Sequence, residues 1–410
     1  MSARALGAGR RVAIVHPAWR SCGTYQVVLG QIAAWRALGA QVTTVAVSDQ
    51  PGFSAGRDWI WRGYRADTPD LDATDRHVAG PPARSVIAPS FITDALWPYL
   101  HGDQAAIRIE LADRATLAPT LAAARFDLIH CNHFFTMPVA RRLAHGAPIL
   151  MESHDVQARQ FTVQNEGGPW LRPHASYETM LARELDAMGG ADVLLHLNAE
   201  EDAFFRAALP GKRHELLYPA VPPAPTGPGG DDVVIVASRN RANVDSLLWF
   251  LRTVAPHLAA PFTIAGSVDA GVRAADAGLY AQRRAAFLGR VDDLGAVYAN
   301  ARLVLLPTIE GTGLSIKTVE ALASGLPLVA TSHAFRGMAF DPATLAGVTI
   351  ADDPAAFAAG VAQALARPAP TPAMRRDSPM RRAYDAHFSA AAYEIRLAAV
   401  AAEVLGRAAR

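Results

Sequence analysis

Short β-branched runs alternate with helix-spaced stretches along most of the chain, and this alternation restricts the fold more than any other feature. It begins with RVAIVHP (11–17), continues with TYQVVLGQIAAWRALG (24–39) and returns to a strand-like run at QVTTVAVS (41–48). Continuous apolar runs are typical of parallel strands buried on both faces, and the intervening helices form the crossovers. The pattern therefore predicts an α/β fold built from doubly wound, Rossmann-like sheets.

The alternation continues to residue 221 and then starts again. Strands are expected before the break at 127–134, 147–155, 191–198 and 214–221, and after it at 232–238, 262–267, 285–291, 303–308, 326–332 and 347–352. Helices are expected between them, with long ones at 111–125, 176–190, 243–258 and 386–410. Residues 49–85 are rich in Pro, Gly and Asp, so we predict that they form a loop excursion from the first sheet.

The clearest break is PAVPPAPTGPGG (219–230), whose prolines and glycines suit neither a helix nor a central strand. A chain of 410 residues is long enough for two or three domains with cores of their own. We predict an N-terminal Rossmann-like domain over 1–222 and a linker over 223–230. A C-terminal Rossmann-like domain is expected over 231–380, followed by a helix over 381–410 that packs back on the first domain.

Composition excludes several classes of protein. The net charge of +1 lacks the basic excess that is usual in nucleic-acid binders. Cys22 and Cys131 are too few for a disulfide framework or a cysteine-based zinc site, so a reducing cytosol is expected. The apolar run VAIV after the basic N-terminus is too short for a signal peptide, and no run of about 20 apolar residues predicts a membrane span.

The segment PTIEGTGLSIKTVEALASG (307–325) carries the strongest chemical signal. A strand ends at Thr308, a Gly-rich turn follows, and a helix is expected to start near Leu314. A turn of this kind presents free N–H groups and the positive end of a helix dipole to an anion. Lys317, one of only two lysines in the chain, adds a cation in the first helical turn, and Glu320 can accept hydrogen bonds from ribose hydroxyls. Ile316 stands where a P-loop or a dinucleotide fingerprint requires glycine or alanine, so neither motif is present.

The second half of the chain resembles a known family through several blocks in order. These are AGS (265–267), FLGRVDDLGAVYANARLVLLPT (287–308), GTGLSIKTVEALASGLPLVAT (311–331) and HAFRG (333–337). Together they resemble the retaining, nucleotide-sugar-dependent glycosyltransferases of family 4, which have the GT-B fold of two Rossmann-like domains facing a cleft. The first half resembles this family less specifically, in ESHD (152–155) and ADVLLHLNAEED (191–202).

The resemblance implies a donor site in the second domain. Glu320 matches the second glutamate of the family's E-x7-E motif, a ribose ligand, while Thr312 stands where the first is expected and Glu310 is a candidate replacement. The turn would then hold the donor through backbone N–H groups, and Arg239 and Arg241 would face its diphosphate. The donor-binding positions implied in this way are Glu320, Thr312, Gly313, Leu314, Ser315, Arg241, Arg290, Val291 and Glu310. The catalytic positions implied are His154, Lys317 and Arg239.

On the acceptor side, His154 matches a histidine close to the transferred sugar, and Asp155 is expected to orient its ring. Gly23 matches a glycine that allows close approach after the first strand, although an ordinary turn explains it equally well. DWIWRGYR (58–65) and LWPYL (96–100) interleave aromatic residues with arginine or proline. Such segments suit contact with a lipid-linked acceptor at a membrane surface, but anchoring of the loop in the first domain's core is the simpler interpretation.

The implied reaction transfers a sugar from a nucleotide-sugar donor to a hydroxyl acceptor, a glycan or glycolipid, with retention of configuration. No cofactor beyond this co-substrate and no metal are expected. His130 and His133 are predicted to point to opposite faces of a strand, and Asp70-Leu71-Asp72 lies in the loop excursion. A cytoplasmic location follows, with peripheral contact at the inner membrane face as an option. A sugar-nucleotide epimerase, a phosphorylase or a catalytically silent nucleotide-sugar-binding relative remains open, because fold does not fix function.

Overall fold

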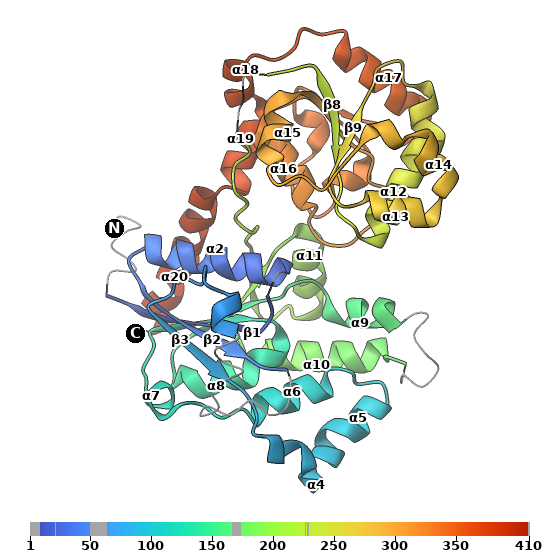
Figure 1. Cartoon of the computed structure of the whole chain (residues 1–410). Coiled ribbons are helices and arrows are strands. Elements are labelled where there is room, and N and C mark those ends of the chain that lie inside the picture. The colour runs from blue at the N-terminus through green and yellow to red at the C-terminus, as the bar shows by residue number, and fades with distance from the viewer. Residues whose placement is uncertain are drawn as a thin grey trace. The chain divides into compact units, whose positions relative to one another are not determined.

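The computed structural model of the chain describes residues 9–20, 22–49, 64–165, 174–225, 227 and 229–408. The chain forms two compact units, drawn in Figure 1. Unit 1 comprises Met1–Pro219 together with Tyr393–Arg410, and unit 2 comprises Ala220–Ala392. Each unit has its own parallel sheet, which confirms the predicted α/β fold of two Rossmann-like domains.

In the described part of unit 1, seven parallel strands pair in the order β3-β2-β1-β4-β5-β6-β7. The chain thus starts in the middle of the sheet and extends it first to one side and then to the other, as in doubly wound folds. The strands are β1 (Arg11–Pro17), β2 (Gln41–Val47), β3 (Asp75–Ala79), β4 (Leu128–Asn132), β5 (Ile149–Glu152), β6 (Val193–His196) and β7 (Arg213–Leu216).

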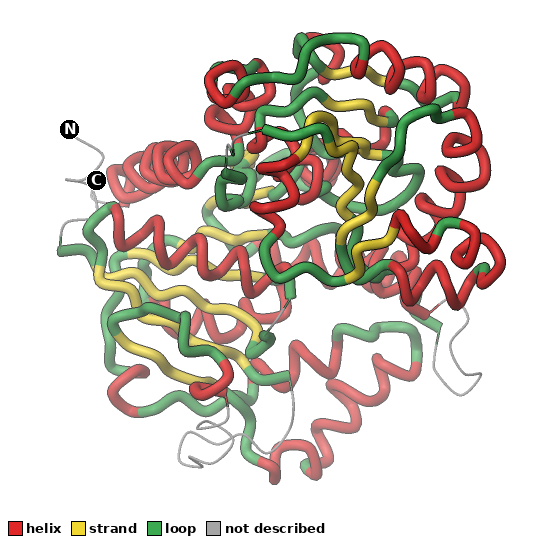
Figure 2. Tube along the Cα trace, turned by 45° about the horizontal axis from the view of Figure 1, so that its top comes forward, coloured by secondary structure: helices red, strands yellow, loops and turns green. Residues whose placement is uncertain are grey.

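Helices lie on both sides of this sheet, as Figure 2 shows, and the buried side chains of alternating strand residues pack against them. The helices that precede α9 include α2 (Gly23–Ala37), α4 (Pro89–Phe91), α5 (Trp97–Leu100), α6 (Ala106–Asp113), α7 (Pro119–Ala122) and α8 (Met137–Ala144). The remaining helices of the unit are α9 (Gln157–Asn165), α10 (Tyr177–Gly189), α11 (Ala199–Ala208) and most of α20 (Ala390–Ala408).

Unit 2 holds a parallel sheet whose six described strands pair in the order β10-β9-β8-β11-β12-β13. The strands are β8 (Asp232–Val236), β9 (Thr263–Ala265), β10 (Phe287–Gly289), β11 (Ala301–Leu306), β12 (Leu328–Ala330) and β13 (Val348–Ile350). The helices are α12 (Arg241–Trp249), α13 (Asp269–Ala275), α14 (Ala277–Gln282), α15 (Leu294–Asn300), α16 (Ile316–Ser324), α17 (Pro354–Leu365), α18 (Pro372–Arg376) and α19 (Pro379–His387). The reversal of strand order lies between β8 and β11, where ligands bind in sheets of this type.

Three expectations about secondary structure were wrong. The excursion over 49–85 contains an edge strand, β3, whose sequence DRHVA carries charges that an edge tolerates. The helix expected over 111–125 is interrupted, because Thr116 pairs with Gly80 and Pro119 starts a new helix. The helix expected over 386–410 is divided between α19 and α20.

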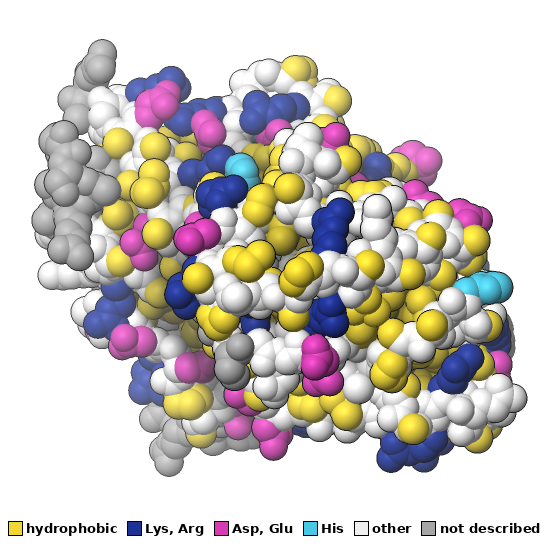
Figure 3. All heavy atoms as spheres, turned by 90° about the horizontal axis from the view of Figure 1, so that it is seen from above, with side chains coloured by type: hydrophobic (Ala, Val, Ile, Leu, Met, Phe, Trp, Pro, Cys, Tyr) yellow, Lys and Arg dark blue, Asp and Glu magenta, His cyan; other side chains and the backbone are white. Residues whose placement is uncertain are grey.

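The end of the chain belongs to unit 1. From α20, Arg396 Nη1 donates to the Leu216 carbonyl over 3.4 Å, and Glu403 pairs with Arg213 of β7 at 2.8 Å. Among the described residues, no helix is long and apolar enough to cross a membrane. Dark blue and magenta side chains are interspersed on the face drawn in Figure 3, in keeping with the near-zero net charge.

Candidate functional site

The turn between β11 and α16 leaves a helix N-terminus open at the carboxyl edge of the unit 2 sheet. The helix begins at Ile316, two residues later than predicted, and its N-cap residue Ser315 makes no side-chain capping bond. The N–H groups of Thr318 and Val319 both donate to the Ser315 carbonyl, over 3.0 and 3.2 Å. Helix geometry leaves the N–H groups that precede them without an intrahelical acceptor, so the turn can receive an anion.

Two glycines and two basic side chains fix the shape of this turn. Gly311 and Gly313 have φ angles of 129° and 65°, which side-chain-bearing residues rarely adopt. His333 Nε2 lies 3.1 Å from the Gly311 carbonyl, and Arg336 Nη2 donates to the Thr312 carbonyl over 3.3 Å. The segment after β12 therefore holds the backbone of the turn. The sequence block HAFRG contained both side chains, but we assigned them no role.

Lys317 is a half-buried ammonium held by an amide rather than by a carboxylate in direct contact. Its Nζ donates to Asn243 Oδ1, and Asn243 Nδ2 donates in turn to the carbonyl and hydroxyl of Ser238, over 2.8 and 3.0 Å. Burial lowers the pKa of Lys317 to about 8, with the nearby Glu320 opposing the shift and Arg336 adding to it. The cation is thus incompletely compensated in the free protein, as a phosphate-binding lysine would be.

Glu320 lies one helical turn beyond Lys317 and faces a buried tyrosine. Burial raises the pKa of the Glu320 carboxyl, while Lys317 and the Tyr298 hydroxyl oppose the shift. The hydroxyl and the carboxylate interact, although their geometry falls outside that of a regular hydrogen bond. Glu320 therefore keeps acceptor capacity for a ligand hydroxyl, as the ribose assignment requires.

The arginine loop after β8 is more exposed than the lysine. Arg239 is exposed, and its backbone N–H donates to Ser267 Oγ over 3.2 Å. Arg241 is 95% exposed and pairs only loosely, at 3.5 Å, with Asp245. Burial and the Asp245 carboxyl raise the pKa of Glu310. The structure thus brings Glu310 together with Asp245 and Arg241.

Thr312 and Arg290 are exposed, whereas Gly313, Leu314 and Val291 are partly buried. Arg290 and Val291 follow β10, whose last residue Gly289 accepts a hydrogen bond of 2.8 Å from the Gly266 N–H. This places the two predicted donor-binding residues beside the carboxyl end of β9. No hydrogen bond or ion pair of the Arg290 side chain appears among the described residues.

In unit 1, His154 is buried in a stack of rings at the carboxyl ends of β4 and β5. Its ring lies 4.3 Å from that of His133 at an interplanar angle of 9°, and its Nε2 lies 2.8 Å from Asn132 Oδ1. His133 Nε2 in turn lies 2.9 Å from the Thr24 hydroxyl. Burial lowers the pKa of His154 to about 3, so its imidazole is neutral at physiological pH.

Strained backbone accompanies this stack. His133, His154 and Asp155 have φ angles of 65°, 53° and 71°, and residues held in such conformations concentrate at functional sites. Asp155 does not orient His154 as predicted: it accepts a hydrogen bond from Gln160, and Asn132 holds the histidine instead. Sequence reasoning missed Asn132 and His133 as partners, although both lie at the carboxyl end of a strand, where a site is expected.

The remaining candidates of unit 1 have separate surroundings. Gly23 is the first residue of α2 and is exposed, and a Cβ atom added there would meet nothing within 4 Å. His130 accepts from Trp35 Nε1 over 3.1 Å and lies 3.5 Å from Glu152, whereas His133 Nε2 lies 2.9 Å from the Thr24 hydroxyl. The segment 58–65 lies outside the described residues except for its last two, while LWPYL forms the surface turn around α5.

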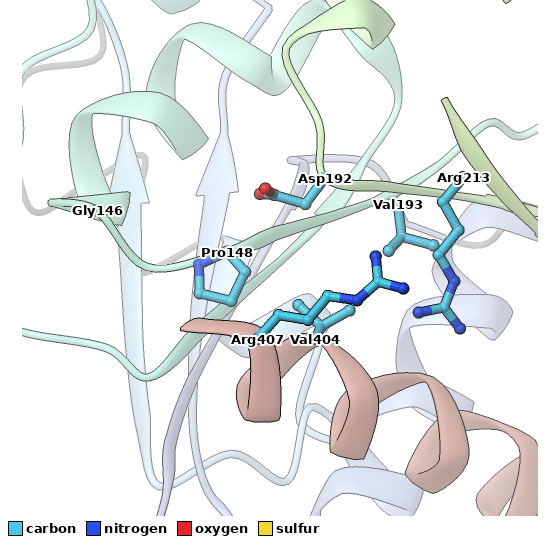
Figure 4. Close-up of a pocket in the computed structure, with 7 residues that line it drawn as sticks. All are labelled: Gly146, Pro148, Asp192, Val193, Arg213, Val404 and Arg407. Atoms are coloured by element: carbon cyan, nitrogen blue, oxygen red, sulfur yellow. The ribbon is translucent and has the colours of Figure 1, made fainter. Parts of the chain in front are cut away.

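A pocket of about 360 Å³ in unit 1 lies at the opposite edge of the sheet, where β5, β6 and β7 begin (Figure 4). Arg213 and Arg407 line it, but both pair with Glu403 of α20, at 2.8 and 2.7 Å. Asp192 accepts the Ile149 N–H over 2.8 Å. These charges are satisfied within the protein, so the pocket is not the candidate site.

Comparison with known proteins agrees with this geometry. Residues 231–367 match the family model described as "Glycosyl transferases group 1". No curated protein sequence matches the chain. The chain is similar over 97% of its length to a glycosyltransferase from Rickettsia africae ESF-5, with 99% of that chain covered, a TM-score of 0.59 and 11% identity.

Two further solved structures have the same fold. Anabaena HepE in complex with UDP is 13% identical, with a TM-score of 0.58, over 96% of this chain and 100% of that one. An E. coli structure described as trehalose-6-phosphate bound with UDP-2-fluoro glucose is 15% identical, with a TM-score of 0.55, over 96% and 99%. The chain therefore has the two-domain GT-B fold, and its residues 231–367 match the family model of the group 1 glycosyl transferases.

Proposed function

We propose that the protein is a retaining glycosyltransferase of the family 4 type, which moves a sugar from a nucleotide-sugar donor to a hydroxyl of a glycan or glycolipid. The observation that carries this proposal is the pair formed by Lys317 and Glu320 at the open N-terminus of α16. The incompletely compensated ammonium of Lys317 suits the phosphates of a nucleoside diphosphate. The half-buried carboxylate of Glu320, one helical turn away, suits its ribose hydroxyls. The UDP and UDP-glucose in the similar Anabaena structures support a nucleotide-sugar donor.

In the proposed reaction the developing negative charge falls on the leaving diphosphate. The N–H groups at the start of α16 and the Lys317 ammonium stabilise that charge, and a dry environment strengthens the effect. Arg239 and Arg241 are exposed and can turn toward the donor when it binds. Glu320 accepts hydrogen bonds from the ribose, and Arg290 and Val291 lie where the base would be held. Because cationic side chains of the protein stabilise the diphosphate, the proposed reaction requires no metal ion.

The neutral His154 ring is proposed to hold a hydroxyl of the transferred sugar rather than to act as an acid. Asn132 and His133 fix the ring, and the exposed Gly23 leaves room for close approach of the sugar. The acceptor binds unit 1 in this proposal. A cytoplasmic location with contact at the inner membrane face remains part of the proposal for a lipid-linked acceptor.

Release of nucleoside diphosphate from a panel of UDP-, GDP- and dTDP-sugars tests the function. A transferase without acceptor releases it slowly through hydrolysis, and the anomeric proton signal of the product reports retention. Lys317→Ala and Glu320→Ala should each abolish release without unfolding the protein. Lys212→Ala should leave release intact, because Lys212 belongs to unit 1 and its Nζ donates to the Ala191 carbonyl there. Unchanged turnover in either donor-site variant refutes the assignment.

The same assay separates the alternatives. An epimerase converts the sugar nucleotide into its epimer, and a phosphorylase requires inorganic phosphate and a cofactor. A catalytically silent relative is stabilised by the nucleotide sugar but turns none over.

A further inference from the structure

Arg108 of α6 lies against three aromatic rings at the carboxyl edge of the unit 1 sheet. Its guanidinium carbon is 5.5 Å from the ring centroid of Trp19, 5.6 Å from that of Phe135 and 5.1 Å from that of Phe161. These rings follow β1, β4 and β5 respectively, so the arginine spans the edge where ligands of parallel sheets bind. Stacking on rings holds the guanidinium plane in a fixed orientation.

The charge of Arg108 is poorly matched within the protein. Asp49 lies 3.9 Å from its Nε, beyond hydrogen-bond distance, and that carboxylate already accepts from Trp19 Nε1 over 3.1 Å. In the described part of the chain, the five donors of Arg108 make no hydrogen bond, and its side chain is 33% exposed. Burial lowers the pKa of Arg108, and Asp49 opposes the shift, but the guanidinium remains charged.

Arg114, six residues on, provides an internal contrast. It also stacks on a ring, at 5.5 Å from Phe91, but two carboxylates at 3.0 Å, those of Glu110 and Asp94, engage its guanidinium. The guanidinium of Arg114 is thus neutralised by acids within the protein. Among the described residues, Arg108 instead packs on rings, with the Asp49 carboxylate at 3.9 Å and no hydrogen bond to an acid.

Ring contacts connect Arg108 to the proposed transfer site. Phe135, under the guanidinium, lies 5.2 Å from His133, and His133 stacks on His154 at 4.3 Å. A ligand hydroxyl near His154 and an anionic group on the same ligand near Arg108 would therefore lie along one edge of unit 1. The guanidinium fork suits carboxylate and phosphate oxygens, which it can bind with two parallel hydrogen bonds.

We propose that the acceptor of this enzyme carries an anionic group, a carboxylate or a phosphate, that docks on Arg108. The inference rests on the proposed function, because it assigns a substrate class to the same reaction. Asp49 limits the strength of the site, since its carboxylate repels the incoming anion. The partly buried Trp19 provides an apolar surface against which the sugar ring of such an acceptor can pack.

Binding of three probes at constant ionic strength tests the proposal by calorimetry: glucose, glucuronate and glucose 6-phosphate. We expect the wild-type protein to bind at least one acid about tenfold or more tightly than glucose, the magnitude of one charge-assisted hydrogen-bonding site. Preference for glucuronate identifies a carboxylate-bearing acceptor, and preference for glucose 6-phosphate a phosphorylated one. The ratio of kcat/KM for p-nitrophenyl glucuronide over p-nitrophenyl glucoside measures the carboxylate preference in turnover.

Four variants complete the test, each checked for folding by its melting point without probe. Arg108→Met keeps the packed stem and should reduce the preference to near unity, while Arg108→Lys should retain part of it. Asp49→Asn keeps an acceptor for Trp19 and should tighten acid binding. Arg114→Gln should leave the preference for the acids over glucose unchanged. An equal affinity for glucose and both acids in the wild type, or a preference that survives in Arg108→Met, overturns the inference.

Measurements of donor binding distinguish failure of the acceptor inference from failure of the proposed function. If nucleotide sugars neither stabilise the protein nor turn over, the transferase proposal fails. If they do, and acid preference is absent or independent of Arg108, only the acceptor inference fails.

Discussion

Donor binding should be accompanied by proton uptake at Lys317. Burial holds the pKa of this lysine at about 8 in the free protein, against an ordinary value of 10.5. At about pH 8.5 the side chain is then about one-quarter protonated, and a diphosphate beside it restores the proton, so each donor bound takes up about 0.75 proton. The full return to the ordinary pKa corresponds to about 3 kcal/mol of interaction, which is an upper limit.

Calorimetric titration with the tightest-binding nucleotide sugar, in two buffers of different ionisation enthalpy, measures this uptake. At about pH 6.5 the lysine is already charged, so uptake should fall to near zero. Lys317→Arg is the matched control variant, because arginine stays protonated at both values of pH. Any proton uptake by the base of the donor is the same in the wild type and in this variant. Equal uptake by the wild type and Lys317→Arg at pH 8.5 refutes the placement of the lysine on the phosphates.

Further predictions concern stability and close approach. The depressed pKa of Lys317 means that this residue binds more protons in the unfolded chain between about pH 8 and 10.5, so the free energy of unfolding of the wild type, relative to that of Lys317→Arg, should rise with pH across that window, as denaturant titrations can show. Gly266→Ala should cost about 2 kcal/mol or more, because the new Cβ would lie 2.2 Å from the Ala237 carbonyl oxygen at a φ of +118°. Gly23→Ala should leave the melting point unchanged but lower turnover about tenfold or more if the sugar approaches its Cα. Arg375→Lys should destabilise unit 2 by about 3 kcal/mol, because this buried guanidinium donates to four backbone carbonyls that one ammonium cannot reach together.

Features that are contiguous in sequence could be predicted well. The apolar runs of β1, β4, β8 and β11 each lie between turn signals, and all became buried parallel strands. The turn before α16 could be predicted equally well, because the end of a strand, two glycines and the start of a helix follow one another around 307–325. These signals depend on local backbone preferences and burial, which a single sequence records.

Partners brought together by the fold were not predictable in the same way. Asn243 contacts Lys317 across 74 positions, and nothing local to either residue indicates the pairing. We assigned roles to the arginines after β8, whereas the group that reaches the lysine is the amide of Asn243 in the first turn of α12. The π-helical turn over Phe250–Val254, which follows α12 within the helix expected over 243–258, likewise leaves no pattern in apolar spacing.

The expected role of Asp155 in orienting His154 was wrong for a related reason. Asp155 was chosen to orient His154 because it is the next residue, but left-handed backbone at both positions turns their side chains toward different partners. Sequence adjacency is a poor guide where the backbone leaves the regular strand. The strand β3 was missed because edge strands lack the continuous apolar run that marks central ones.

Thermal stabilisation by nucleotide sugars in three proteins tests the central claim most directly: the wild type, Lys317→Ala and Lys212→Ala. At a concentration about 100 times Kd, at least one UDP-, GDP- or dTDP-sugar should raise the Tm of the wild type and of Lys212→Ala by about 5 °C or more. The same ligand should leave the Tm of Lys317→Ala nearly unchanged. Equal stabilisation of all three proteins, or no stabilisation by any member of the panel, would contradict a donor site at the N-terminus of α16.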